Sequence, residues 1–272
     1  MTVTQKKKMT AKERAIYELK EWSKAFVVAF VAAIIIRLFV FETMMVPTGS
    51  MIPTIMPGDR LFIEKITYSA REPEIGEIVV FWTPFVDKQA LSMLGWFDKF
   101  MDLFSPRKFK GHVKYVKRLV GKEGDVLELV EVAGKGYQLY VNGKVPESLK
   151  DRYYDKEGVF SDPKFYVKIA FPERTIGNKR YLFTQLKQIL SYSDYYQEYL
   201  KDLNLEEYIW RDPATGRVKV KIPKGFCFMM GDNSKDSLDS RFFGFVPVEN
   251  IIGQPMLRIW PLNRFGPVKT VR

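Results

Sequence analysis

The chain has 272 residues, 46% of them apolar and 28% charged, so it can build a hydrophobic core and does not have the composition of a disordered protein. Lysine and arginine exceed aspartate and glutamate by 43 − 32 = 11, a balance that suits either nucleic acid or anionic lipid headgroups. The single cysteine, Cys227, excludes an internal disulfide, and the single histidine, His112, excludes a two-histidine metal site.

The N-terminal segment is typical of a basic tail followed by a membrane anchor. Residues 1–24 are rich in lysine and arginine, and residues 25–41 (AFVVAFVAAIIIRLFVF) are apolar except for Arg37, whose head group can snorkel to the membrane surface. The positive-inside rule predicts a cytoplasmic N-terminus, with residues 42–272 on the extracytoplasmic side. A cleaved signal peptide is disfavoured because no small-x-small site follows, and a buried core helix is the other alternative.

The pattern beyond Pro57 predicts a mainly antiparallel β domain. Short runs rich in Val, Ile, Leu and aromatic residues are separated by Gly, Pro or Asp, and Asn142-Gly143 is a strong hairpin-turn signal. The expected strands cover residues 61–66, 78–82, 113–120, 126–132, 137–141, 218–222, 226–230 and 251–260.

Two segments depart from the β pattern. Within residues 84–111, apolar residues between Met93 and Phe104 share one helical face, which predicts either an interfacial membrane helix or a helix packed on the sheet. Residues 131–222 are expected to form an inserted α+β lobe, with one or two helices in residues 181–209. We expect a structural or specificity role for this lobe.

A serine stands in a turn framed by Gly and Pro, a few residues beyond the apolar span, at residues 46–54 (VPTGSMIPT). The hydroxyl of Ser50 becomes a nucleophile only if a base takes its proton. His112 would need an orienting acid and lies in an expected loop, and the carboxylates Asp59 and Asp239 rank below a lysine.

Lys117 lies in the expected apolar strand 113–120 and can act as a base if it is buried, because desolvation disfavours the ammonium form. Taken alone, a lysine on a strand is more often solvated. A dense polar loop, residues 231–241 (GDNSKDSLDSR), stands between apolar strands and can orient a neighbouring amine.

These motifs together resemble the bacterial type I signal peptidases, the Ser-Lys dyad family also called leader peptidases. Four blocks follow the N-terminal span in the family's order. They are residues 46–54 (VPTGSMIPT), 58–65 (GDRLFIEK), 115–125 (YVKRLVGKEGD) and 231–247 (GDNSKDSLDSRFFGFVP).

The resemblance implies a role for each matched residue. Ser50 matches the nucleophile and Lys117 the general base, while Thr48 and the Ser50 amide match the oxyanion hole. Ser237 matches the serine that orients the lysine amine. The remaining matches are structural residues near the site, namely Asp239, Arg241, Ser240, Asp232 and Asn233. The chain departs from the family at residues 234–236, where Ser-Lys-Asp replaces Arg-Asp-Asn, and at residues 122–123, where Lys-Glu replaces Leu-Pro.

The implied function is that of a membrane-bound serine endopeptidase that removes N-terminal signal peptides from exported preproteins through an acyl-enzyme, without metal or cofactor. The implied partners are preproteins, membrane phospholipids and the translocation machinery, and no nucleic acid. The implied location is the cytoplasmic (inner) membrane, which the chain crosses once.

Two alternatives remain. A self-cleaving repressor-type protease would carry a DNA-binding module in place of the span. A membrane-tethered, non-catalytic β domain that binds envelope partners would leave the Lys117 amine open to water and far from Ser50.

Overall fold

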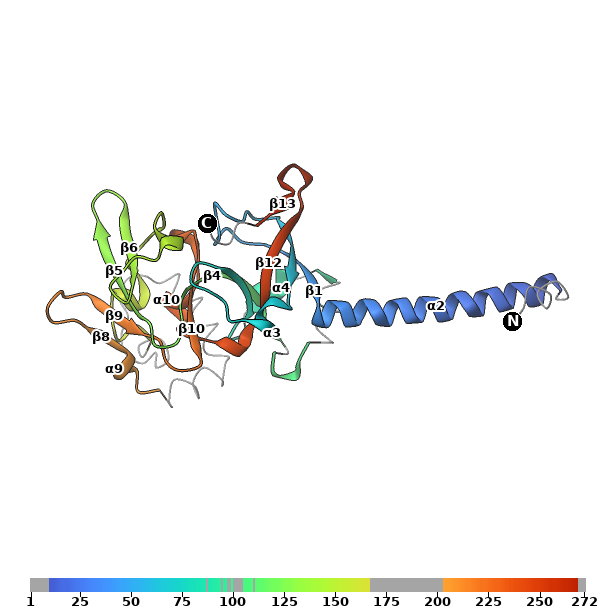
Figure 1. Cartoon of the computed structure of the whole chain (residues 1–272), viewed down its shortest axis with the longest axis horizontal. Helices are drawn as coiled ribbons and strands as arrows, with labels where there is room; N and C mark the ends of the chain where they lie inside the picture. The colour runs from blue at the N-terminus through green and yellow to red at the C-terminus, as the bar shows by residue number, and fades with distance from the viewer. Residues whose placement is uncertain are drawn as a thin grey trace. The chain divides into compact units, whose positions relative to one another are not determined.

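Figure 1 shows the chain as a computed structural model, which describes residues 10–86, 88–93, 95–96, 99, 105–109, 111–166 and 203–268. The chain divides into two compact units, Met1–Glu42 and Thr43–Arg272.

The first unit is dominated by one long helix, α2 (Ala11–Phe39). It begins earlier than the expected span because Thr10 and Glu13 form a capping box that satisfies the first backbone N–H groups. It ends at Phe39, two residues before the expected end, because Phe41 begins a strand. Among the described residues, α2 is the helix long and apolar enough to cross a membrane, and none of its residues is buried.

The second unit is built on two antiparallel sheets, which confirms the expected mainly β fold class. The larger sheet has the order β1-β2-β12-β3-β4-β10-β11, with β13 paired to β12. Its strands are β1 (Phe41–Met45), β2 (Arg60–Glu64), β12 (Ile251–Trp260), β3 (Ile78–Trp82), β4 (Lys114–Gly121), β10 (Phe226–Met230), β11 (Val246–Pro247) and β13 (Gly266–Pro267).

The smaller sheet has the order β7-β6-β5-β9-β8. Its strands are β7 (Tyr153–Tyr154), β6 (Gly136–Val141), β5 (Val126–Val132), β9 (Val218–Lys221) and β8 (Ile209–Arg211). Short helices and turns connect the strands of both sheets. They are α3 (Thr67–Ala70), α4 (Lys88–Met93), η2 (Arg107–Phe109), η3 (Glu147–Leu149), η4 (Gly158–Phe160), α9 (Leu205–Tyr208), η5 (Ser234–Asp236), α10 (Ser240–Phe243), η6 (Val248–Asn250) and η7 (Leu262–Arg264).

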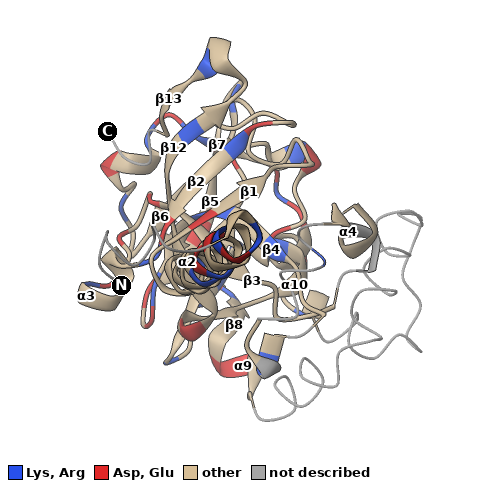
Figure 2. Cartoon of the chain, turned by 90° about the vertical axis from the view of Figure 1, so that its right-hand side faces the viewer, with Lys and Arg blue, Asp and Glu red and all other residues tan. Residues whose placement is uncertain are grey.

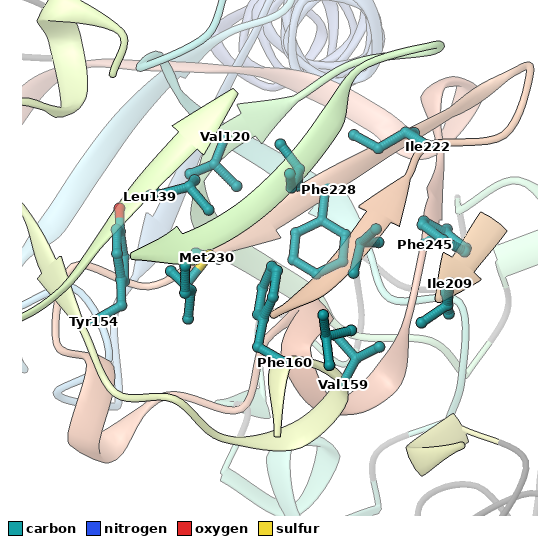
Figure 3. Packing of buried hydrophobic residues seen from close by; sticks show 14 of the residues in the cluster. Val120, Leu139, Tyr154, Val159, Phe160, Ile209, Ile222, Phe228, Met230 and Phe245 are labelled. Carbon is teal, nitrogen blue, oxygen red and sulfur yellow. The ribbon is translucent and has the colours of Figure 1, made fainter. Parts of the chain in front are cut away.

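A hydrophobic cluster joins the two sheets (Figure 3). Val120, Phe228 and Met230 come from β4 and β10 of the larger sheet, and Leu139 comes from β6 of the smaller one. Full burial of such a side chain contributes about 1.5–3 kcal/mol. Strand β10 is therefore firmly anchored at the point where the polar loop after it begins.

Two expectations fall mostly outside the described residues. Of the expected helix between residues 93 and 104, positions 94, 97–98 and 100–104 are not described, so its interfacial role stays a prediction. The expected helices in residues 181–209 are described only from residue 203, where α9 is followed by strand β8. The boundaries of the inserted lobe also stay a prediction.

Candidate active site

Ser50 lies in the turn between β1 and β2, and only 7% of the residue is exposed. The late polar loop holds this turn from one side. Asn233 donates its backbone N–H to the Ser50 carbonyl at 3.0 Å and its side-chain amide to the Gly49 carbonyl at 3.0 Å. Gly49 also accepts a hydrogen bond from the Ile52 N–H at 3.1 Å. Hydrogen bonds from the polar loop and from within the turn thus fix the backbone at Gly49 and Ser50.

Lys117 reaches this hydroxyl from the middle of β4, where it pairs with Val79 of β3. The residue is 4% exposed, and its Nζ donates a hydrogen bond to Ser50 Oγ at 2.5 Å. The Nζ also lies 5.3 Å from the centroid of the Tyr115 ring, two residues earlier on the same face of the strand. The structure therefore brings together the serine and the lysine that the sequence marked as nucleophile and base.

Burial changes the acidity of this lysine. Desolvation is the largest cause, and it lowers the pKa of Lys117 from its ordinary 10.5 to about 8. The positive charge of Arg241 lowers the pKa further, while the nearby carboxylates oppose the shift. Those carboxylates are Asp239, Asp232 and Asp236. A lysine with this pKa is partly neutral near pH 7 and can accept a proton.

The polar loop is delivered beside Lys117 by strand pairing. In β10, Met230 pairs with Arg118 of β4, so the loop that begins at Gly231 starts next to the lysine. A side chain at Gly231 would collide with the Ser237 side chain and with the Ser50 carbonyl. The close approach of the loop to the serine turn therefore requires glycine at this position.

A buried ion pair follows at the start of α10. The Arg241 guanidinium donates Nε to Asp239 Oδ1 and Nη2 to Asp239 Oδ2, each at 2.9 Å, and both residues are fully buried. Burial alone would raise the pKa of Asp239, but the charge and hydrogen bonds of Arg241 outweigh it and hold that pKa below its usual value. Asp239 also accepts from the Gly231 N–H at 3.0 Å, and Ser240 Oγ accepts from the Met229 N–H at 3.0 Å. Asp239 and Ser240 thus tie the start of α10 to the beginning of the loop and to β10.

A second buried carboxylate, Asp232, links four parts of the fold. Arg118 of β4 donates to it through Nε at 2.8 Å and Nη2 at 2.7 Å, and Arg152 pairs with it at 2.8 Å. Thr54, just after the serine turn, donates its hydroxyl to Asp232 as well. Burial would raise the pKa of Asp232, but these arginines hold it below its usual value.

Two of the expected support residues, Thr48 and Ser237, are not held by comparable hydrogen bonds within the part of the chain that the structure describes. Thr48 is exposed, beside the serine turn. Ser237 is buried, and among the described residues its Oγ makes no hydrogen bond of regular geometry, although it lies close enough to help lower the pKa of Asp239. The roles of Thr48 in the oxyanion hole and of Ser237 in orienting Lys117 therefore stay predictions.

His112 and Asp59, which were also considered as bases, interact with residues other than Ser50. The Nδ1 of His112 is hydrogen-bonded to the Thr83 carbonyl at 2.7 Å. Asp59 is fully buried and pairs with Arg258 at 3.0 Å and with Arg264 at 2.6 Å, a network that the sequence did not reveal. Figure 2 shows basic positions on β4 and β12, the strands that carry Lys117 and Arg258. Among the side chains that the structure describes, no cluster of three or more His, Cys, Asp or Glu residues is arranged to hold a metal ion.

Comparison with known proteins gives consistent matches over most of the chain. The family model described as "Signal peptidase, peptidase S26" matches residues 19–260. A "Probable signal peptidase I-2" of Synechocystis sp. is 30% identical over 263 residues, which cover 97% of this chain and 82% of the relative. A "Signal peptidase I" of Buchnera aphidicola subsp. Schizaphis graminum is 29% identical over 250 residues, with 85% and 71% covered.

Among solved structures, a signal peptidase I from Enterococcus faecalis matches with a TM-score of 0.27 and 16% sequence identity. The match covers 68% of this chain and 97% of that one.

Proposed function

Since the chain belongs to the signal peptidase family, peptidase S26, we propose that Ser50 and Lys117 form a Ser-Lys dyad that cleaves N-terminal signal peptides from exported preproteins. Membership of the family makes the chain a serine endopeptidase. The observation that carries the dyad assignment is the hydrogen bond of 2.5 Å between Lys117 Nζ and Ser50 Oγ, made by a buried amine. A non-catalytic domain was expected to leave the Lys117 amine open to water and far from Ser50, whereas here the residue is buried and the two side chains are hydrogen-bonded.

In the proposed acylation step, neutral Lys117 takes the proton of Ser50 Oγ as that oxygen attacks the scissile carbonyl carbon. The negative charge that develops on the carbonyl oxygen is stabilised by the Ser50 backbone N–H and the Thr48 hydroxyl. Loss of one such donor typically costs about 3 kcal/mol of transition-state stabilisation. Lys117 then gives its proton to the leaving amine as the peptide C–N bond breaks, which leaves an ester on Ser50.

In the proposed deacylation step, Lys117 is neutral again and takes a proton from a water molecule. The resulting hydroxide attacks the ester carbonyl, the carbon–Oγ bond breaks, and the proton returns to Ser50. Every proton passes through one amine, so the rate depends on the protonation state of Lys117.

The N-terminal helix together with family membership indicates a membrane-anchored protein. Our more specific proposal is a single span in the cytoplasmic membrane, with the lysine-rich tail in the cytoplasm and the catalytic unit on the far side. On that side the catalytic unit would meet translocated preproteins as substrates. Its other proposed partners there are the phospholipid headgroups and the translocation machinery. The excess of lysine and arginine over acidic residues in residues 1–24 supports this orientation.

The test is the cleavage of a model preprotein by the full chain in lipid vesicles. Ser50→Ala and Lys117→Ala should each abolish cleavage while the variants still insert and fold. His112→Gln is the matched control, because the histidine contacts Thr83 rather than Ser50, and it should cleave at the wild-type rate. Retained cleavage in either dyad variant would refute the assignment.

A further inference from the structure

Residues 153–166, which begin with strand β7 of the smaller sheet and are called the lobe strap here, pack against the loop that carries the buried ion pair. The Asp155 N–H donates to Ser234 Oγ at 2.7 Å, and Arg241 Nη1 donates to the Asp155 carbonyl at 3.2 Å. At the other end of the strap, the Tyr166 hydroxyl donates to the Ser240 carbonyl. The strap therefore binds backbone and side-chain atoms on both sides of the Asp239–Arg241 pair.

Ser234 is the link between the lobe strap and Arg241. The residue is buried, and its Oγ accepts two hydrogen bonds at 2.7 Å, one from the Asp155 N–H and one from Arg241 Nη1. Its backbone carbonyl accepts a third from Arg241 Nη2 at 2.8 Å. Ser234 is also one of the positions at which this chain departs from the family's pattern.

The guanidinium of Arg241 is saturated by these partners. Its Nε–H and one Nη2–H bind Asp239, its other Nη2–H binds the Ser234 carbonyl, and its Nη1 binds Ser234 Oγ and the Asp155 carbonyl. An arginine side chain has five N–H donors, so each has an acceptor here. The orientation of the guanidinium on Asp239 is therefore set as much by Ser234 and Asp155 as by the carboxylate itself.

The backbone of the lobe strap approaches the backbone of Arg241 closely at Gly158. Gly158 has a positive φ of 58°, and a Cβ at this position would collide with the Arg241 carbonyl. Glycine at this position permits the close approach, and moving the strap away would break the hydrogen bond from the Asp155 N–H to Ser234 Oγ. The strap therefore packs directly against Arg241.

The position of Arg241 matters to the base because its charge and that of Asp239 have opposite effects on Lys117. Asp239 raises the pKa of the amine and Arg241 lowers it, while Asp232 and Asp236 of the same loop both raise it. On its own strand, the amine faces the ring of Tyr115. A guanidinium that moved off Asp239 would leave that carboxylate less neutralised and would favour the protonated amine.

We infer that Ser234 is a positioning residue, which together with the lobe strap holds Arg241 on Asp239 and so keeps Lys117 available as a neutral base. The inference rests on the proposed Ser-Lys dyad. It gives the segment after β7 a direct part in the catalytic scaffold rather than a role in folding alone.

The test compares the pH dependence of kcat/KM for Ser234→Ala and wild type, using the full chain and a model preprotein. The inflection should move to higher pH in Ser234→Ala, and a shift of half a pH unit would lower activity at pH 7 about threefold while leaving activity at high pH near the wild-type value. The matched control is Ser161→Ala. Ser161 lies in the same strap, but its hydroxyl donates to the Gly158 carbonyl, so its inflection should not move.

Ser234→Cys gives a second reading if the alanine variant folds poorly, because a thiol keeps the side chain's shape but is a weak acceptor. Its inflection should also move to higher pH. A wild-type inflection in the folded Ser234 variants, or an equal loss of activity at every pH, would overturn the inference. Either result would leave the dyad standing as long as Lys117→Ala is inactive, whereas an active Lys117→Ala would refute the dyad itself.

Discussion

Raising the pH from 7 to 9 should increase kcat/KM for signal-peptide cleavage about tenfold, because Lys117 must lose its proton before it can act as a base. With a pKa of about 8, about one lysine side chain in eleven is neutral at pH 7 and about ten in eleven at pH 9. Activity is therefore low below this pKa, rises through it and levels off above it. A solvated lysine with the ordinary pKa of 10.5 would instead give a rise of about a hundredfold over the same range, without a plateau.

The assay is the initial rate of cleavage of a fluorogenic signal-peptide substrate at concentrations well below KM, measured from pH 6 to 10 in buffers of constant ionic strength. Under these conditions kcat/KM reports the pKa of the free enzyme. His112→Gln should give the same curve, which separates the lysine from the single histidine of the chain. An inflection near 6.5 that disappears in this variant, or a rate still rising steeply at pH 10, would refute the argument that burial tunes Lys117.

Three further changes test the scaffold around the dyad. Gly231→Ala should destabilise the protein by about 1–3 kcal/mol in urea titration and lower cleavage more than tenfold, because the new methyl group collides with the Ser50 carbonyl. Wild-type activity in this variant would contradict the close approach of the loop to the serine turn. Asp232→Asn should cost about 3–5 kcal/mol of unfolding free energy, because it leaves the buried Arg118 without its charged partner, and a loss below 1 kcal/mol would count against a stabilising role. Asp59→Asn should cost about 2 kcal/mol in the same titration, since Asp59 accepts hydrogen bonds from the Met56 N–H and from an arginine; an unchanged midpoint would contradict that.

The strands that could be predicted from the sequence are those whose signal is local. β3 and β10 are short apolar runs bounded by breakers, and both begin and end where the pattern predicts. β1 (Phe41–Met45) was missed because its first residue continues the apolar run of α2. β11 has two residues and exists only because it pairs with β10, which no local pattern reveals.

The candidate site likewise has features that local sequence motifs predict and features that depend on tertiary contacts. The motifs around Ser50 and Lys117 could be recognised in the sequence, but strand alternation assigns a lysine only to a face and does not say whether that face is packed. Burial is the largest cause of the lowered Lys117 pKa, and the charges that also shift it belong to residues 231–241, which reach β4 only through tertiary pairing. The link from Ser234 to Asp155 spans 79 residues, so no spacing rule could have predicted it.

The central claim is that Ser50 attacks the substrate with Lys117 as its base, and the most direct measurement is capture of the covalent intermediate. A model preprotein is mixed with excess enzyme in vesicles, quenched with acid during the first turnover, digested and analysed by mass spectrometry. The account predicts the mass of the signal peptide's acyl end as an ester on the fragment that contains Ser50, present in the wild type and absent from Ser50→Ala and Lys117→Ala. An adduct on another residue, or an adduct that forms at the wild-type rate in Lys117→Ala, would contradict it.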